Sequence, residues 1–261
     1  VFLAAALASF LAPFASDEQF RDFPDAPPSA RFLLGTDEMG RDRFSRLLYG
    51  SQVSLLLAPA AALLSTLIAT VIGGAAGFFG GWLERIALAL ADLFSSMPWL
   101  FLLLMVRAVL PLNVDPHASL AITFLLLSLL GWPAGARVVR AGIKAVRESD
   151  YCLAARSRGT GAWRLLAMHV LPNLRPAMIA QFWLSVPLFL IAEANLGILG
   201  LGVSEPLPSW GNLLMEMVRQ HQSAWSRPWL LVPALVVVGT LLLVQLGSGT
   251  PARVRAGAGR E

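Results

Sequence analysis

Long apolar runs alternate along the chain with shorter stretches that carry most of the charges. Crossing about 30 Å of hydrocarbon at about 1.5 Å per residue takes on the order of 20 apolar residues. The runs that reach or approach this length cover residues 1–15, 53–79, 86–110, 118–136, 177–203 and 228–246. This pattern predicts an all-α fold, a polytopic membrane bundle of about six transmembrane helices. The chain opens at Val1 inside the shortest run without an initiator Met, so we expect residues 1–15 to be a truncated first helix.

The composition supports a membrane location. Hydrophobic residues make up 56% of the chain and charged residues 14%, and the mean hydropathy is +0.66. A soluble surface needs more charge than this, so the apolar excess must face the lipid bilayer. The net charge is +4, but the basic residues gather in particular loops rather than in one stripe. This distribution indicates membrane topology and no nucleic-acid partner.

The side chains of catalytic and metal chemistry are sparse. The single cysteine, Cys152, excludes an intrachain disulfide, and the three histidines fall in three different loops. The sequence has no G-x-x-x-x-G-K-[ST] phosphate-binding loop, no H-E-x-x-H and no G-x-S-x-G. We therefore expect a protein that is not an enzyme, with no metal or cofactor of its own.

Basic residues near helix ends indicate the cytoplasmic side of a membrane. Residues 137–175 carry eight of them against only Glu148 and Asp150, so we assign the loop 137–176 to the cytoplasm. By alternation, the amino terminus and the tail 247–261 are also cytoplasmic, and the loops 16–52, 111–117 and 204–227 face outward. Three arginines in the first outer loop argue against this orientation: Arg41, Arg43 and Arg46. Because the central loop carries more basic residues than the first outer loop, it determines the predicted orientation. Residues 53–246 are then expected to form a five-helix core.

Residues 36–50 have acids early, bases late and apolar residues at helical spacing. This order suits a helix dipole and an apolar stripe, which predicts a helix lying in the membrane interface. The alternative is a solvated connector before the membrane helix.

The central loop carries a pattern of its own. Residues 151–169 predict a short helix through Ala154 and Ala155, a break at Gly159 and Gly161, and a second helix that starts near Ala162 and ends at Pro172. A helix, a glycine turn and a helix form a compact shape that can dock onto another protein. A basic juxtamembrane segment that binds anionic lipid is the alternative.

Three ionisable residues fall inside the apolar runs, where each costs about 2.5–3.5 kcal/mol near a helix centre. We expect Asp92 to pair with Arg85, seven residues earlier, and Arg107 to reach the outer interface. Glu193, close to Asn195, either bonds a neighbouring helix or lies on a solute path. Glycines at 73 and 77 and at 197, 200 and 202 permit close contact between helices.

Several ordered motifs point to a known family. Residues 34–46, LGTDEMGRDRFSR, resemble the LGTD-x-x-GRD-x-x-SR signature of the peptide and nickel permeases. Residues 192–203, AEANLGILGLGV, followed by PSWG at 208–211, are also similar to that family. The resemblance extends over residues 34–229. It implies a type I permease subunit of an ATP-driven ABC importer in the bacterial cytoplasmic (inner) membrane.

The central loop resembles the ATPase-docking motif of this family, E-A-A-x-x-x-G followed by a segment that ends in L-P. The matching positions here are Leu153, Ala154, Ala155, Arg156, Gly159, Gly161, Leu171 and Pro172. Leu153 stands where the family has glutamate, which removes a charge expected at the docking surface. The chain end from Gly247, GSGTPAR, also departs from the usual tail of the family.

The resemblance further implies a division of labour. A second, homologous permease completes the pore, two cytoplasmic ATPases bind ATP and Mg and dock on the central loops, and an external binding protein delivers the solute. Candidate residues of the solute path are Asp92, Glu193 and Asn195. A stand-alone secondary transporter and a degenerate, non-transporting membrane subunit are the alternatives. The solute, whether a peptide or a nickel complex, is not specified by the sequence.

Overall fold

The computed structural model describes residues 8–111, 114–220 and 226–257. Within these ranges the regular structure is helical, apart from one isolated bridge between Thr36 and Asp42. The predicted all-α fold is therefore confirmed. Of the predicted first helix, residues 1–7 lie outside the described ranges, and the remainder contains only the short helix α2 (Ala8–Leu11). His221 and the last four residues of the predicted tail also lie outside them.

Four continuous helical stretches are long and apolar enough to cross a membrane. They are α3 (Arg43–Phe79), α6 (Pro116–Leu130) continuing into α7 (Trp132–Arg147), α9 (Ala162–Leu165) continuing into α10 (Arg175–Ile198), and a 3-10 turn (Pro228–Leu231) continuing into α12 (Val232–Gly257). The described residues thus supply four spans, or five if the bent pair α4 (Gly81–Ser96) and α5 (Trp99–Val109) is one span.

The predicted single run 86–110 is broken into α4 and α5, whose axes differ by 89°. The break falls at Met97, which has the extended backbone angles φ −95° and ψ 143°. Pro98 follows, and a proline disfavours helical geometry in the residue before it. The break thus has a local cause in the sequence.

The helix predicted within residues 36–50 begins only at Arg43 and continues into the long α3, and its place in the membrane interface stays a prediction. Residues 16–42 form turns, and α3 begins at Arg43, so residues 43–50 are the first turns of a membrane helix. The start of α3 is fixed by Asp42, whose carboxylate accepts hydrogen bonds from the Ser45 backbone N–H at 2.8 Å and the Ser45 hydroxyl at 2.7 Å. An aspartate in this position satisfies an N–H group that the first helical turn leaves free.

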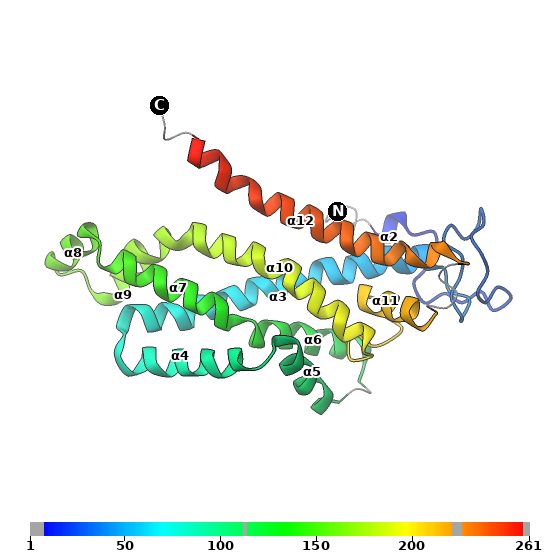
Figure 1. The fold of residues 1–261 in the computed structure, drawn as a ribbon, viewed down its shortest axis with the longest axis horizontal. Coiled ribbons are helices and arrows are strands. Elements are labelled where there is room, and N and C mark those ends of the chain that lie inside the picture. The colour runs from blue at the N-terminus through cyan, green and yellow to red at the C-terminus, as the bar shows by residue number, and fades with distance from the viewer. Residues whose placement is uncertain (1–7, 112–113, 221–225, 258–261) are drawn as a thin grey trace. The chain divides into compact units, whose positions relative to one another are not determined.

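The chain divides into two compact units, and the ribbon of Figure 1 traces the elements that build them. The first unit comprises residues 1–59, 106–124 and 187–261, and the second comprises residues 60–105 and 125–186. α3, α5, α6 and α10 each contribute residues to both units. The two units carry different candidate sites.

In the second unit, α3 packs closely on α7. A Cβ atom on Gly73 would lie 2.3 Å from the carbonyl oxygen of Ala136, and one on Gly77 would lie 2.8 Å from that of Arg140. Only glycine allows this approach of the two backbones. The close contact predicted from the glycine spacing is therefore confirmed.

Candidate functional site

The predicted helix, glycine turn and helix of the central loop are present in the second unit. The first helix is α8 (Asp150–Ser157), and α9 begins at Ala162 (Figure 1). Between them Gly159 has φ +81°, a left-handed conformation that side chains other than glycine rarely adopt. The second helix does not end at Pro172, because a π-helix (Leu166–Val170) and a 3-10 turn (Leu171–Leu174) continue it into α10.

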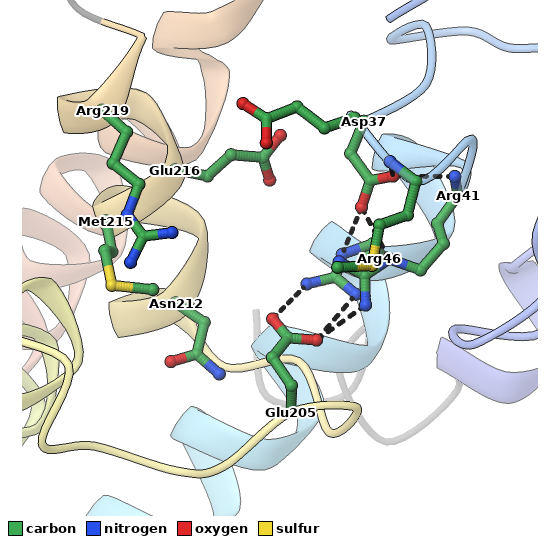
Figure 2. A pocket seen from close by; sticks show the side chains of 10 residues that line it. Asp37, Arg41, Arg46, Glu205, Asn212, Met215, Glu216 and Arg219 are labelled. Atoms are coloured by element: carbon green, nitrogen blue, oxygen red, sulfur yellow. Dashed lines mark hydrogen bonds and ion pairs between the residues drawn. The ribbon is translucent and has the colours of Figure 1, made fainter. Parts of the chain in front are cut away.

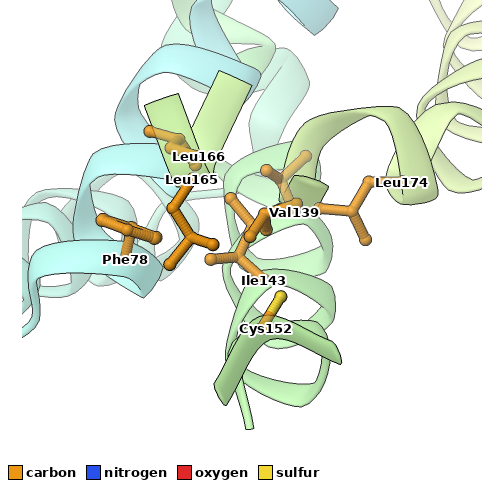
Figure 3. Packing of buried hydrophobic residues seen from close by; sticks show 8 residues of the cluster. Phe78, Val139, Ile143, Cys152, Leu165, Leu166 and Leu174 are labelled. Carbon is orange, nitrogen blue, oxygen red and sulfur yellow. The ribbon is translucent and has the colours of Figure 1, made fainter. Parts of the chain in front are cut away.

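A hydrophobic core fixes one face of this segment. Cys152 of α8 and Leu165 of α9 are buried together with Val139 and Ile143 of α7, and Phe78 closes the cluster from the end of α3 (Figure 3). Tight packing of this kind holds a loop in one conformation. The central loop is therefore a folded element, not a loose connector.

The other face of the segment is exposed. Of the residues that match the docking motif, Leu153, Ala154, Arg156, Gly159 and Gly161 are exposed, and Ala155, Leu171 and Pro172 are half-buried. Large apolar side chains are exposed beside them, with Leu153 at 50% and Trp163 at 71%. Exposed apolar side chains gathered in one short segment are typical of an interaction surface.

Ion pairs join α4 to α7 in the second unit. Glu84 pairs with Arg140 and with Lys144, the latter at 2.5 Å. Asp92 pairs with Arg137 at 2.7 Å. The predicted pair of Asp92 with Arg85 is therefore wrong, because the partner comes from a neighbouring helix instead of the same one.

The first unit contains a cluster of charged residues from the two predicted outer loops (Figure 2). Glu205, in the irregular segment between α10 and α11 (Trp210–Arg219), accepts a hydrogen bond from Arg41 at 2.7 Å and from Arg46 at 2.8 Å. Asp37 holds the same two arginines from the other side, at 2.6 Å for Arg41 Nε and 3.7 Å for Arg46 Nε. The two loops, far apart in sequence, are thereby joined.

A cavity of about 130 Å³ lies in this cluster. It is lined by Asp37, Glu38, Met39, Arg41 and Arg46 and, from the other loop, by Glu205, Asn212, Met215, Glu216 and Arg219. Figure 2 shows the α11 side chains facing the arginines across this space. Just outside the lining, Arg43 pairs with Glu216 at 2.9 Å.

The pKa values of Glu205 and Glu216 are shifted in opposite directions. Burial works against ionisation of Glu205, but Arg46 and Arg41 outweigh it and hold the pKa of this carboxyl below its ordinary value. Burial also raises the pKa of Glu216 above its ordinary value, although Arg43 opposes the shift. For Arg41, burial is outweighed by Glu205 and Asp37, so the pKa of the guanidinium is raised.

α11, which lines the cavity, packs on α3 and α10. The Trp210 indole N–H donates to the Ser51 hydroxyl at 2.9 Å, and the Trp210 backbone N–H donates to the Ser54 hydroxyl at 3.1 Å. A Cβ atom on Gly197 would lie 2.3 Å from the Cα atom of Gly211, so α10 and α11 touch through their backbones. α11 therefore has a fixed position beside the charged cluster.

The candidate path residues do not form one site in either unit. Glu193 is 1% exposed, and its Oε2 accepts a hydrogen bond of 2.9 Å from the Ser54 hydroxyl. Asn195 is half-buried two positions later, while Asp92 belongs to the second unit. A role of these three residues in the solute path stays a prediction.

The expectation that Arg107 reaches the outer interface is wrong. Arg107 is 1% exposed and donates to the Pro111 carbonyl at 3.1 Å, the Ser119 hydroxyl at 3.2 Å and the Gly202 carbonyl at 3.5 Å. It thus ties α5 and α6 to the segment after α10. Neither this role nor that of Glu205 had a signal in the sequence, because the bonding partners other than Pro111 are 12 to 164 residues away.

Comparisons with known proteins agree with this architecture. Residues 69–248 match the family described as binding-protein-dependent transport system inner membrane component. The di/tripeptide transport system permease protein DppC of Pseudomonas aeruginosa (strain UCBPP-PA14) is 35% identical over 249 residues, which cover 93% of this chain and 79% of the relative. The dipeptide transport system permease protein DppC of Bacillus subtilis (strain 168) is 33% identical, with 81% and 64% covered. The oligopeptide transport system permease protein OppC of the same organism is 35% identical, with 74% and 61% covered.

The long apolar helices indicate a multi-pass membrane protein, and the relatives are subunits of transport systems. The chain belongs to the family of inner-membrane components of binding-protein-dependent transport systems, and its homologues are permease subunits of ABC importers. The resemblance seen in the sequence is thereby confirmed.

Proposed function

We propose that this chain forms half of the translocation pathway of an ATP-driven importer for peptides or a similar small solute. The relatives DppC and OppC are named for dipeptide, di/tripeptide and oligopeptide transport, which favours peptides over nickel complexes. A second permease subunit completes the pathway, two ATPase subunits bind ATP and Mg, and an external binding protein delivers the solute.

The observation that carries the proposal is the folded central loop. It is anchored through Cys152, Leu165 and Leu166 and exposes the Gly159 turn, so it can transmit a force rather than yield to one. Closure of the ATPases would move this segment together with α7, to which it is packed. Rigid elements that move as units are the usual means of switching a transporter between its two open states.

The proposed orientation places the central loop and both termini in the cytoplasm. The ion pairs of Glu205 with Arg41 and Arg46 support this, since they join the two loops assigned to the outer side. In these loops Arg41, Arg43 and Arg46 are each paired with an acid.

The test compares two glycines of the same kind in different loops. Gly159 and Gly200 are both exposed, have φ +81° and +74°, and have no atom within 4 Å of an added Cβ. Proline, which requires negative φ, cannot fit either position. The tagged chain is co-expressed with its permease partner and ATPases and purified in detergent. ATP-dependent uptake of a labelled dipeptide is then measured in proteoliposomes to which the binding protein is added.

We expect Gly159→Pro to reduce ATPase retention and uptake at least tenfold, whereas Gly200→Pro retains the ATPase. Loss of the ATPase from both variants would mean that general misfolding causes the effect. A wild-type chain that binds no ATPase would overturn the importer and favour the degenerate subunit or the stand-alone transporter.

A further inference from the structure

Two carboxylates of very different exposure hold the arginines of the outer cavity. The side chains of Arg41, Arg46 and Asp37 are 9%, 2% and 3% exposed, so this part of the cluster is internal. The side chain of Glu205 is 43% exposed and lies on an irregular segment. Asp37 is therefore the fixed counterion, and Glu205 is the partner that solvent can reach.

The pairing restricts what can replace Glu205. Taking the acid away from a buried arginine is unfavourable, because the remaining charge is left uncompensated. Arg41 and Arg46 present three donors to Glu205, at 2.7, 3.3 and 2.8 Å, in the fork geometry that suits a carboxylate. Another carboxylate, with the same charge and shape, can take this place at low cost.

The cavity has the room for such a group, and it is lined by three arginines beside four acids, one of which is Glu205 itself. A water molecule needs roughly 10–15 Å³, so about 130 Å³ holds the end of an acidic side chain. Arg219 lines the wall that α11 provides, and it forms no ion pair within the part of the chain that the structure describes. An entering carboxylate therefore meets Arg219, which no acid of the described residues pairs with, as well as the two arginines that Glu205 occupies.

We propose that this cavity is a docking site for an acidic side chain of the external binding protein, which displaces Glu205 from Arg41 and Arg46. The inference rests on the proposed function, which places these loops on the outer side and makes the binding protein the partner. Glu205 then acts as an internal substitute that keeps the arginines neutralised while the binding protein is absent.

The test measures binding of the purified binding protein to the complete transporter in lipid nanodiscs by biolayer interferometry. Glu205→Gln removes the competing charge, so we expect docking to tighten by about threefold to tenfold. Arg219→Ala removes a free guanidinium and should weaken docking by about the same factor. Asp22→Asn, which changes an exposed acid of the same loop away from the cavity, is the charge-matched control and should change affinity less than about twofold.

Thermal unfolding and ATPase retention of each variant show whether the subunit is intact. If Glu205→Gln is folded but docks no more tightly than Asp22→Asn, the proposal is wrong. ATP-dependent uptake by the wild-type transporter in that same case would leave the proposed function standing. A labelled trialanine that binds Glu205→Gln without the binding protein, while its C-terminal amide does not, would assign the site to the solute and overturn the binding protein as occupant.

Discussion

At the scale of single residues, the ionisable groups within the apolar runs are held by hydrogen bonds to elements that are distant in the sequence. Hydropathy identified Asp92, Arg107 and Glu193 as unusual, since each is an ionisable residue within an apolar run. It could not identify their partners, because Arg137, Gly202 and Ser54 come from other elements. A charged residue within an apolar run indicates a free-energy cost, but the sequence does not show which group offsets that cost.

Glu193 allows the two alternatives for such a residue to be separated. Its carboxyl bonds Ser54, and no cation pairs with it within the described part of the chain. If its role is to bond helices, Glu193→Gln keeps the hydrogen bond and should change the unfolding free energy by less than about 1 kcal/mol. Glu193→Ala loses it and leaves a cavity, which should cost about 2–4 kcal/mol. Thermal unfolding in detergent, together with dipeptide uptake, measures both effects.

The decisive result is the uptake by a stable Glu193→Gln variant. Unchanged uptake supports the bonding role. A stable variant that transports no more than Glu193→Ala would mean that the negative charge is needed, which is the behaviour of a residue on the solute path. Ser54→Ala is the matched control, because it removes the same hydrogen bond from α3 and leaves the carboxyl in place.

At the scale of elements, the helices were largely predictable and their ends were not. Runs of apolar residues located the cores of α3, α6, α10 and α12, since lipid imposes their length. The start of α3 at Arg43 depends on a cap by Asp42, and the bend between α4 and α5 depends on Pro98. Both signals are single residues, and hydropathy averaged over about 20 residues does not detect them.

Part of the internal structure of the central loop was predictable from its sequence. The glycine break and the start of α9 at Ala162 followed from local rules for helix ends. The continuation through Pro172 into α10 did not, because a 3-10 turn accepts the proline that an α-helix interior would exclude. Packing of Leu165, Leu166 and Leu174 in one core supplies the stability that the local sequence lacks.

Adjacent glycines on α3 provide a test of the contact between α3 and α7. A Cβ on Gly73 would meet the Ala136 carbonyl at 2.3 Å, whereas one on Gly74 would meet only the Ile143 Cδ1 at 3.6 Å. We expect Gly73→Ala to destabilise the subunit by about 1–3 kcal/mol or more, since a backbone atom cannot move aside as a side chain can. Gly74→Ala should be neutral or stabilising by up to about 1 kcal/mol, because alanine favours the helix.

The readout is the thermal unfolding midpoint of both variants in the same detergent. Equal loss of stability in the two would contradict the close backbone contact. A further check is ATPase retention, since α7 carries the core beneath the docking segment and a displaced α7 should weaken docking as well.

At the scale of the whole molecule, the central loop exposes apolar side chains that the proposed assembly with an ATPase would bury. Tyr151, Leu153, Trp163 and Met168 are all exposed there. The peptide permease pattern has glutamate at Leu153, and the change to leucine has two readings. Either the ATPase of this system has an apolar site opposite Leu153, or coupling is impaired. The three other apolar side chains favour an adapted apolar surface.

A substitution back to the family residue distinguishes these readings in the assembled transporter. If the partner surface is adapted, Leu153→Glu buries a carboxylate without a partner and should weaken ATPase retention about tenfold, while Leu153→Met, of similar volume and polarity, should retain it. The measurement is the amount of ATPase that co-purifies with the tagged chain, beside ATP-dependent uptake. An increase of both quantities in Leu153→Glu would show that leucine impairs coupling, and the degenerate subunit would then account better for this chain than a fully coupled importer.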